Sequence, residues 1–312
     1  MTTAPAEKVR FAHKAEFTAL RAVVGALGTL DWRRAGNIGA RIGALGYRPL
    51  GIRRRVVERQ IAAAFPGLGD RGVRRVARAA YEHLGRASIE AAILPRLGRN
   101  AVLNLFEAVD NWTAVEQALS LRRGLILVTG HLGNWELGGA YIAARGVGVD
   151  AIVRRMSNPL FDRYLTETRS QIGMVVVHDA EAVRRTPRSL REGRAVAFLA
   201  DQGVLGLAST FVPFFGRPAK TPRGPAVFAL RLQVPIIFGV AVRQKSGKYR
   251  LAFEPVAVED TGDRDKDIDA IVARYTATLE RWVRRYPEQY FWHHRRWRRQ
   301  PPNTPPHLRE PT

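Results

Sequence analysis

The stretch that decides the expected fold is GLILVTGHLGNWELGG, residues 124–139. Its first part, residues 125–129, is a short apolar run with the length and β-branched content of a buried strand. Gly130 ends this run, His131 follows, and a segment from Trp135 onward is expected to be helical. The stretch therefore predicts a strand, a turn and a helix, with a histidine at the point where the strand ends.

The spacing of His131 and Glu136 limits how these two side chains could meet. Positions five apart on an unbroken helix diverge by roughly 140°, so the two would not share a face. A pair requires His131 in the turn and Glu136 in the first helical turn, where a carboxylate also suits the helix N-terminus. Such a partner would raise the basicity of the imidazole and fix its tautomer, as a general base requires. The spacing is also compatible with a loop histidine that only caps or packs.

The length and composition of the chain limit the classes of protein to which it can belong. A chain of 312 residues, 46% hydrophobic and without internal repeats, suits one elaborated domain and excludes a disordered protein. The sequence contains no cysteine, which excludes disulfides, thiolate metal sites and cysteine nucleophiles and fits a reducing compartment. No cluster of other metal ligands is evident, so neither a metal nor a cofactor is expected.

The charge balance is strongly basic, with 50 Lys and Arg against 28 Asp and Glu and a net charge of +22. Such a field attracts nucleic acid, an anionic membrane surface or an acidic protein partner. The arginines are spread along the chain, which favours a broad surface effect over one nucleic-acid-binding element. A basic, non-catalytic protein that binds membranes or nucleic acid is therefore one alternative to an enzyme.

The first hundred residues are expected to form a helical region that associates with membranes. Residues 8–47 combine an apolar stripe with basic flanks, as a helix lying in a membrane interface does. A helix that faces the core is the alternative. No cleavable signal peptide is evident, and the apolar run at residues 17–30, interrupted by Arg21, is shorter than the roughly 20 residues of a membrane span. The region's glycines would permit close packing of helices, at positions 25, 28, 36, 39, 43 and 46.

Residues 101–290 are expected to form an α/β core, because short apolar runs alternate there with amphipathic segments. The expected strands are residues 125–129, 150–153, 174–178, 195–200, 234–242 and 249–253. The expected helices are residues 112–120, 135–145, 159–172, 180–192, 222–232 and 265–285. Thr221 and Pro222 suit the opening of a helix. His131, Arg154 and Asp201 all lie at predicted strand ends, where the active residues of such sheets cluster.

Residues 291–312 form a basic tail rich in aromatic residues and proline. Its aromatic residues, interleaved with arginine, could stack on bases, sit at a membrane interface or cover an edge of the core. No nucleic-acid-binding motif accompanies them, so the membrane and core interpretations are favoured and nucleic acid is not an expected partner. A metal site at His293, His294 and His307 is not expected.

Several motifs together carry a family resemblance. They occur in this order: RRRVVERQIAAAFPGL, GHLGNWELGG, VRRMSNPLFDRYLTETR, FLADQG, FVPFFGRPAKTPRGPAVFALR and YPEQYFWHHRRWRR. In this order they resemble the bacterial lipid A late acyltransferases of the lauroyl and myristoyl type, within the lysophospholipid acyltransferase superfamily. The resemblance covers nearly the whole chain. It favours the catalytic interpretation of His131 over a capping or packing role.

The resemblance implies a membrane enzyme of lipid A (lipopolysaccharide) biosynthesis. Such an enzyme moves a fatty acyl chain from an acyl carrier protein thioester, or acyl-CoA, to a hydroxyl of a phosphorylated glycolipid acceptor. It would work at the cytoplasmic face of the inner membrane, held monotopically or by a single N-terminal anchor, against an anionic membrane surface. The implied fold is a mixed central sheet flanked by helices, like that of glycerol-3-phosphate acyltransferases, with N-terminal interfacial helices.

The resemblance also assigns roles to residues. His131 would be the general base and Glu136 its orienting partner, with no covalent intermediate. Five further residues would bind the phosphorylated acceptor or complete the wall of the site: Arg154, Asn158, Arg169, Asp201 and Gln202. The sequence Ala-Asp-Gln-Gly at 200–203 differs from the Glu-Gly block of glycerolipid acyltransferases and favours the lipid A branch. Actinobacterial acyltransferases of phosphatidylinositol mannosides share a similar histidine and acid motif, so that glycolipid is the alternative acceptor.

General chemical principles support these roles. An alcohol that attacks a thioester must lose its proton as the bond forms, and a positioned base contributes roughly 10²–10⁴-fold to the rate. The oxyanion that forms needs hydrogen-bond donors, and backbone N–H groups at the start of the helix after His131 are the expected source. Arginine suits phosphates because its planar fork binds two oxygens at once.

Overall fold

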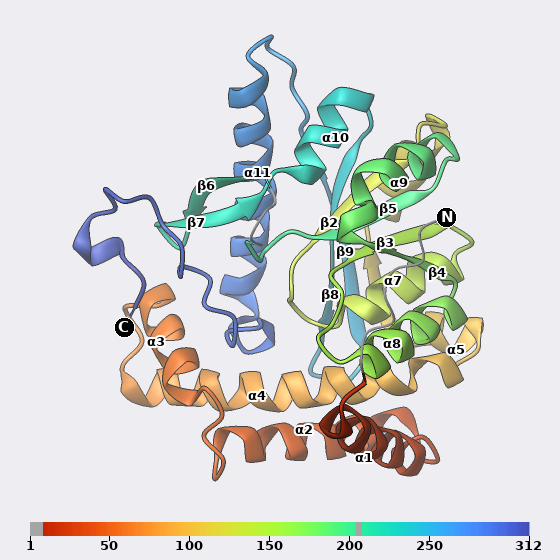
Figure 1. The fold of residues 1–312 in the computed structure, drawn as a ribbon, viewed down its shortest axis with the longest axis vertical. Helices are drawn as coiled ribbons and strands as arrows, with labels where there is room; N and C mark the ends of the chain where they lie inside the picture. The colour runs from red at the N-terminus through yellow and green to blue at the C-terminus, as the bar shows by residue number, and fades with distance from the viewer. Residues whose placement is uncertain (1–8, 204–207, 312) are drawn as a thin grey trace.

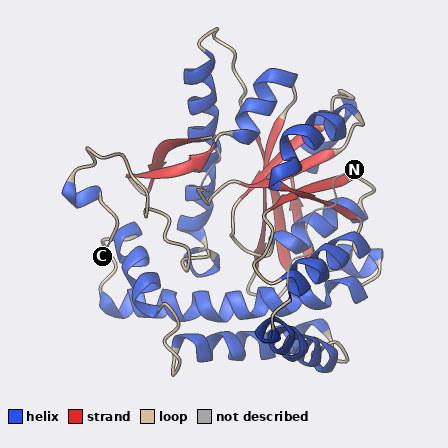
Figure 2. Ribbon diagram, viewed as in Figure 1, coloured by secondary structure: helices blue, strands red, loops and turns tan. Residues whose placement is uncertain are grey.

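The computed structural model describes residues 9–203 and 208–311, and within them a seven-stranded sheet forms the centre of the fold (Figures 1 and 2). The strand order is β1-β9-β8-β2-β5-β3-β4. The strands are β1 (Phe106–Asp110), β2 (Leu125–Thr129), β3 (Val149–Val153), β4 (Met174–His178), β5 (Ala195–Leu199), β8 (Ile236–Arg243) and β9 (Tyr249–Val256). Neighbouring strands are parallel except for β8 and β9, which pair in antiparallel fashion. The expected mixed α/β sheet is thus confirmed.

Helices cover both faces of this sheet. Their bounds are α1 (Phe11–Leu27), α2 (Trp32–Tyr47), α3 (Arg54–Ala64), α4 (Asp70–Ile93), α5 (Arg99–Asn104), α6 (Trp112–Ser120), α7 (Trp135–Ala144), α8 (Pro159–Gln171), α9 (Asp179–Arg191), α10 (Gly224–Leu232) and α11 (Arg264–Arg285). Short 3₁₀ turns lie at η1 (Leu94–Arg96), η2 (Pro287–Gln289) and η3 (Pro306–Leu308). Side chains of β2 alternate between two cores: Ile126 and Val128 pack with α9, α10 and α11, whereas Leu125 and Leu127 pack with α6 and α7. Because both faces are buried, the strand is almost continuously apolar.

The sequence did not indicate a separate antiparallel hairpin. It consists of β6 (Ser209–Phe214) and β7 (Arg217–Pro222), paired with each other. Thr221, expected to cap the following helix, lies instead in β7 opposite Thr210. Helix α10 begins later, at Gly224. The pairing of Thr221 with the neighbouring strand therefore outweighs its local preference for capping a helix.

The N-terminal helices form a layer below the sheet in the view of Figure 1, where α4 runs across the base and α2 lies beneath it. The helical region expected over residues 8–47 consists of α1 and α2, and Asp31 caps α2 by accepting a hydrogen bond from the Arg34 backbone N–H. Helices α2 and α4 pack closely at glycines: a Cβ on Gly43 would lie 2.1 Å from the carbonyl oxygen of Tyr81. In the described part of the chain, none of the helices has both the length and the apolar character needed to cross a membrane.

The tail packs against the same core as α3, α4 and the hairpin. Trp292 and Trp297 are fully buried, and Arg296 is buried with its guanidinium donating to the Lys220 carbonyl and the Thr221 hydroxyl. The sequence left several roles open for the tail's aromatic residues. These two tryptophans have the structural role, in which they cover an edge of the core.

The close approach of α2 and α4 generates a stability prediction. Gly43→Ala is expected to lower the free energy of unfolding by roughly 1–3 kcal/mol, because the new methyl group would overlap backbone atoms of α4. Gly25→Ala is the matched control, since a Cβ there meets no atom within 4 Å, and it should be neutral or stabilising by up to about 1 kcal/mol. Thermal and denaturant unfolding followed by circular dichroism measures both. Equal shifts in the two variants would contradict the packing argument.

Candidate active site

The register of two neighbouring strands brings His131 and Asp201 together. Strands β2 and β5 are parallel, and Thr129 pairs with Leu199. His131 and Asp201 each lie two residues beyond this pair, at the same edge of the sheet. The His131 Nδ1 atom lies 2.7 Å from Asp201 Oδ1, and the His131 backbone N–H donates to Asp201 Oδ2 at 3.0 Å. One carboxylate thus holds both the backbone and the imidazole of His131.

The charge on Asp201 determines the tautomer of this imidazole. Burial alone would raise the pKa of Asp201, which is 2% exposed, but attraction to protonated His131, the two hydrogen bonds from it and the charge of Arg296 lower that pKa to about 2. Asp201 is therefore a carboxylate near neutral pH, and His131 Nδ1 donates the proton between them. In the neutral form of the imidazole, Nε2 then carries the lone pair, on a side chain that is 22% exposed.

Aromatic rings and the chain's tail surround the imidazole. The Trp135 ring meets it edge-on, with centroids 4.9 Å apart, and the Phe291 ring lies at 5.9 Å. The Phe291 backbone N–H donates to the His131 carbonyl at 2.9 Å. Gln202 Nε2 lies 3.1 Å from His131 Nδ1. Gln202, expected to complete the wall of the site, therefore lies beside His131.

The expected pair of His131 and Glu136 is not formed. The Glu136 carboxylate accepts hydrogen bonds from Arg169, through Nε at 3.0 Å and Nη2 at 2.5 Å, and from the Trp135 indole at 3.2 Å. His131 lies in the turn and Glu136 in the first turn of α7, which is the placement that the expected pair requires, yet the two side chains do not meet. Asp201 makes the contact that was expected of Glu136, because the strand register brings its carboxylate to Nδ1. Trp135, whose indole donates to Glu136 and whose ring contacts the imidazole, lies between the two residues.

Three residues expected to bind the acceptor occupy different environments. Arg154 follows β3 directly, is exposed and has no ion-pair partner among the described residues. The Arg169 side chain is mostly buried, and Glu136 occupies two of its nitrogens. Asn158 is a correction: it is buried as the N-cap of α8, and its amide donates to the His13 carbonyl and Glu16 of α1. Its amide is therefore engaged in joining α8 to α1.

A buried polar network from α4 supports the turn after His131, and nothing in the local sequence indicated it. Asn134 caps α7 through its side-chain oxygen, while its amide donates to Glu90 Oε2 at 3.0 Å. The hydroxyl of Tyr249 donates to the same carboxylate, and His83 Nε2 lies 3.0 Å from the carbonyl of Gly133. Helix α4 thereby fixes the turn that carries the histidine.

An apolar cavity begins at the wall of the site and extends between the sheet and α7. Trp135, Glu136 and Arg169 line it near the site. Its apolar lining comes mainly from β2, β3, β5, β9 and α7: Leu127, Val128, Ile142, Val149, Ala151, Val153, Met174, Ala197, Leu199, Leu251 and Phe253. The paired glycines Gly138 and Gly139 also line it, where larger side chains would narrow the space. The cavity suits an unbranched apolar chain better than a polar ligand.

No set of three or more metal-ligating side chains occurs among residues 9–203 and 208–311.

Comparison with known proteins gives a consistent result. The family model for bacterial lipid A biosynthesis acyltransferases matches residues 6–299. The chain is 24% identical over 271 residues to the lipid A biosynthesis lauroyltransferase of Escherichia coli, covering 86% of this chain and 87% of that protein. It is 26% identical over 269 residues to the lipid A biosynthesis palmitoleoyltransferase of the same organism, with 85% of each chain covered. A phosphatidylinositol mannoside acyltransferase of Mycobacterium tuberculosis is 27% identical over 159 residues, which is 49% of each chain.

His83, a partly buried histidine beneath the turn, generates a pH prediction. Burial, together with the charges of Arg86 and Arg243, outweighs the hydrogen bond to Gly133 and lowers the pKa of His83 from 6.5 to about 4. Between these values the unfolded state binds a proton that the folded state does not, so the free energy of unfolding falls as the pH falls from 6.5 towards 4. One such group contributes about 1.4 kcal/mol per pH unit.

His83→Gln tests this contribution, because an amide can still donate to the Gly133 carbonyl but does not titrate. Denaturant unfolding from pH 7 to pH 5 should show a shallower decline in the variant than in the wild type. His293 and His294, whose pKa values burial also lowers to about 4, remain in both proteins. Parallel declines in the two proteins would rule out the contribution of His83.

Proposed function

Because the chain belongs to the bacterial lipid A biosynthesis acyltransferase family, we propose that it transfers a fatty acyl chain from an acyl thioester to a hydroxyl of a lipid A precursor. The thioester would be carried by acyl carrier protein or by coenzyme A. The observation that carries the mechanism is the contact of 2.7 Å between His131 Nδ1 and the buried Asp201 carboxylate, on a histidine side chain that is 22% exposed.

In the proposed reaction, His131 Nε2 accepts the proton of the acceptor hydroxyl as its oxygen attacks the thioester carbonyl. Asp201 holds the reactive tautomer and stabilises the imidazolium that forms. The tetrahedral intermediate then breaks its carbon–sulfur bond, and the departing thiolate receives the proton from His131. The products are an ester and a free thiol, and no covalent enzyme intermediate is formed.

The N-terminus of α7 is the proposed donor to the oxyanion. The backbone N–H groups of residues 132–134 are engaged by Gly130, Gln289 and Ala241. The N–H groups of Trp135 and Glu136 in the first helical turn have no hydrogen-bond acceptor among the described residues. Both residues line the cavity near the site, and amides at a helix N-terminus stabilise developing negative charge.

Arg154 is the residue proposed to bind a phosphate of the acceptor. The pairing of Ile152 with Phe198 places Arg154 level with Ala200, at the sheet edge that carries His131 and Asp201. Its guanidinium is exposed and unpaired among the described residues, so both of its donor edges are available to phosphate oxygens. Arg169 is proposed to position Glu136 and Trp135, because its charge is already neutralised.

The proposed partners follow from charge and exposure. The net charge of +22 suits the acidic surface of an acyl carrier protein and an anionic membrane. On α1 and α2, Phe11 is 86% exposed, and Ile42 and Leu45 are also exposed beside basic residues. We propose that these N-terminal helices hold the enzyme on the cytoplasmic face of the inner membrane, monotopically or together with a single N-terminal anchor.

A second acceptor is the alternative. The similarity to a phosphatidylinositol mannoside acyltransferase favours a mannolipid hydroxyl, although it spans about half of each chain. Mass spectrometry of the products formed from both acceptors, each offered with acyl carrier protein and coenzyme A thioesters, distinguishes the two.

The dyad assignment predicts the effect of three substitutions. His131→Ala and Asp201→Asn should each reduce transfer of a labelled acyl chain by roughly 10²–10⁴-fold, because the first removes the base and the second removes the charge that holds its tautomer. Glu136→Gln, the control carboxylate, should have a smaller effect, since it perturbs only the wall. Circular dichroism verifies that each variant folds. A larger loss in Glu136→Gln than in Asp201→Asn would refute the dyad.

The apolar cavity predicts the choice of acyl chain. Ala151→Leu places additional carbon atoms in the cavity, so the variant should prefer shorter acyl chains than the wild type. Mass spectrometry of products from a mixture of acyl thioesters measures the preference. Ala62→Leu, at an exposed position of α3, is the control of equal size. An unchanged product distribution in Ala151→Leu would exclude this cavity as the acyl site.

A further inference from the structure

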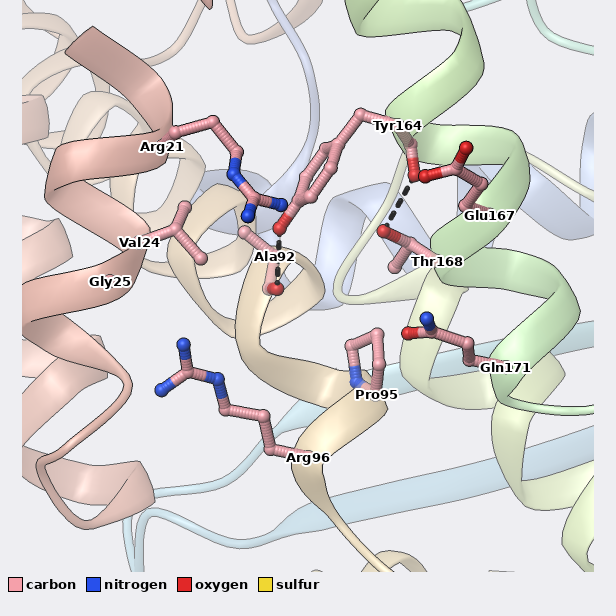
Figure 3. A pocket seen from close by; sticks show the side chains of 10 residues that line it. All are labelled: Arg21, Val24, Gly25, Ala92, Pro95, Arg96, Tyr164, Glu167, Thr168 and Gln171. Atoms are coloured by element: carbon pink, nitrogen blue, oxygen red, sulfur yellow. Dashed lines mark hydrogen bonds between the residues drawn. The ribbon is translucent and has the colours of Figure 1, made fainter. Parts of the chain in front are cut away.

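A second pocket, of about 180 Å³, lies between α1, the η1 turn that follows α4, and α8 (Figure 3). It is separate from the catalytic dyad, since neither His131 nor Asp201 lines it. Val24 and Pro95 give it apolar walls, whereas Arg21, Arg96 and Gln171 supply donors.

The donors of Arg21, Arg96 and Gln171 face a shared space, and none of these side chains is hydrogen-bonded to a described residue. In Figure 3 the side chains of Arg21 and Arg96 extend from α1 and η1 toward the gap between the helices, and the amide of Gln171 faces the same gap. Neither arginine forms a salt bridge with any described residue. Among the described side chains that line the pocket, Glu167 is the one carboxylate, so donors and positive charge prevail. The pocket therefore suits an anion.

Specific contacts hold the pocket in shape. The Tyr164 hydroxyl donates to the Ala92 carbonyl at 3.1 Å, which fixes α8 against α4, and the Arg21 guanidinium lies 5.7 Å from the centre of the Tyr164 ring. Arg96 depends on a glycine: a Cβ on Gly28 would lie 1.5 Å from Arg96 Nη1. The guanidinium thus occupies the carbonyl end of α1, where positive charge is favoured.

The surroundings indicate which anion is bound. Helix α1 exposes Phe11 and Val23 and carries basic residues, the pattern of a helix that lies on a lipid surface. A planar guanidinium fork matches two oxygens of a phosphate. We propose that the pocket binds the phosphate of an anionic phospholipid headgroup and so fixes α1 to the membrane. This proposal concerns membrane attachment and does not depend on acyl transfer.

The test compares vesicle binding by charge-matched variants of the full-length protein. Arg21→Gln/Arg96→Gln removes both donors, whereas Arg184→Gln/Arg191→Gln removes two exposed charges of α9, remote from α1 in Figure 1. Flotation with phosphatidylcholine vesicles that contain phosphatidylglycerol should show roughly 30-fold weaker binding for the pocket variant, at about 1 kcal/mol per arginine. The α9 variant should bind nearly as well as the wild type. Equal losses in both would indicate diffuse attraction and overturn the proposal.

Two further measurements test whether the pocket itself binds the lipid phosphate. Gly28→Leu keeps both charges but displaces Arg96, so it should weaken vesicle binding while retaining its melting temperature within a few degrees; normal binding would contradict the pocket. Calorimetric titration with inorganic phosphate at fixed ionic strength tests the source of the anion. Saturable phosphate binding combined with normal vesicle binding by the double variant would refute the lipid assignment.

An assay of acyl transfer from detergent-dispersed substrates distinguishes a failure of this proposal from a failure of the proposed function. The pocket variant should retain transfer there, since neither arginine belongs to the dyad. If transfer is absent in the wild type, the proposed function fails while the vesicle result still stands. If transfer is normal and the vesicle difference is absent, only the pocket proposal fails.

Discussion

The parallel register of β2 and β5 is the constraint on which the site depends. It places two loop residues, 70 positions apart in the sequence, at the same offset beyond paired strand residues, and a hydrogen bond of 2.7 Å between His131 and Asp201 results. Because both strands are buried on both faces, a shift of register would disrupt two cores at once. The fold thus holds the geometry of the proposed dyad with the same interactions that stabilise the centre of the protein.

The sequence predicted the parts of this arrangement that are local. The strand at 125–129, the histidine after it and the helix from Trp135 were correct, and so was the position of Asp201 at a strand end. The partner of His131 was wrong because choosing it required the order of strands. In the sheet β5 lies beside β2, although β3 and β4 come between them in the chain. Without that adjacency, Glu136 was the nearest acid, and the equal offsets of His131 and Asp201 could not be recognised.

The contacts by which distant segments hold the site were even harder to predict from the sequence. Glu90 and His83 lie on a helix that reads as an ordinary amphipathic element, yet they hold Asn134 and Gly133. Asn158 was expected to be part of a binding motif. In the structure its side-chain oxygen caps α8 and its amide nitrogen donates to α1. Buried polar groups need partners, but a sequence does not state which partner the fold will supply.

Helix α8 connects the chemistry of the sheet with the helices proposed to contact lipid. At its start, Asn158 donates to α1; near its end, Arg169 pairs with Glu136 at the wall of the active site. The dyad itself extends from strands, whose packing leaves little freedom, whereas the wall is formed by two helices joined through one ion pair. In the proposed reaction a glycolipid and a thioester both reach Nε2, so the proposal places any movement that admits them in the wall and not in the dyad. The proposed base is thus held by packed strands and its boundary by two helices, and α8 is the element that joins this boundary to α1.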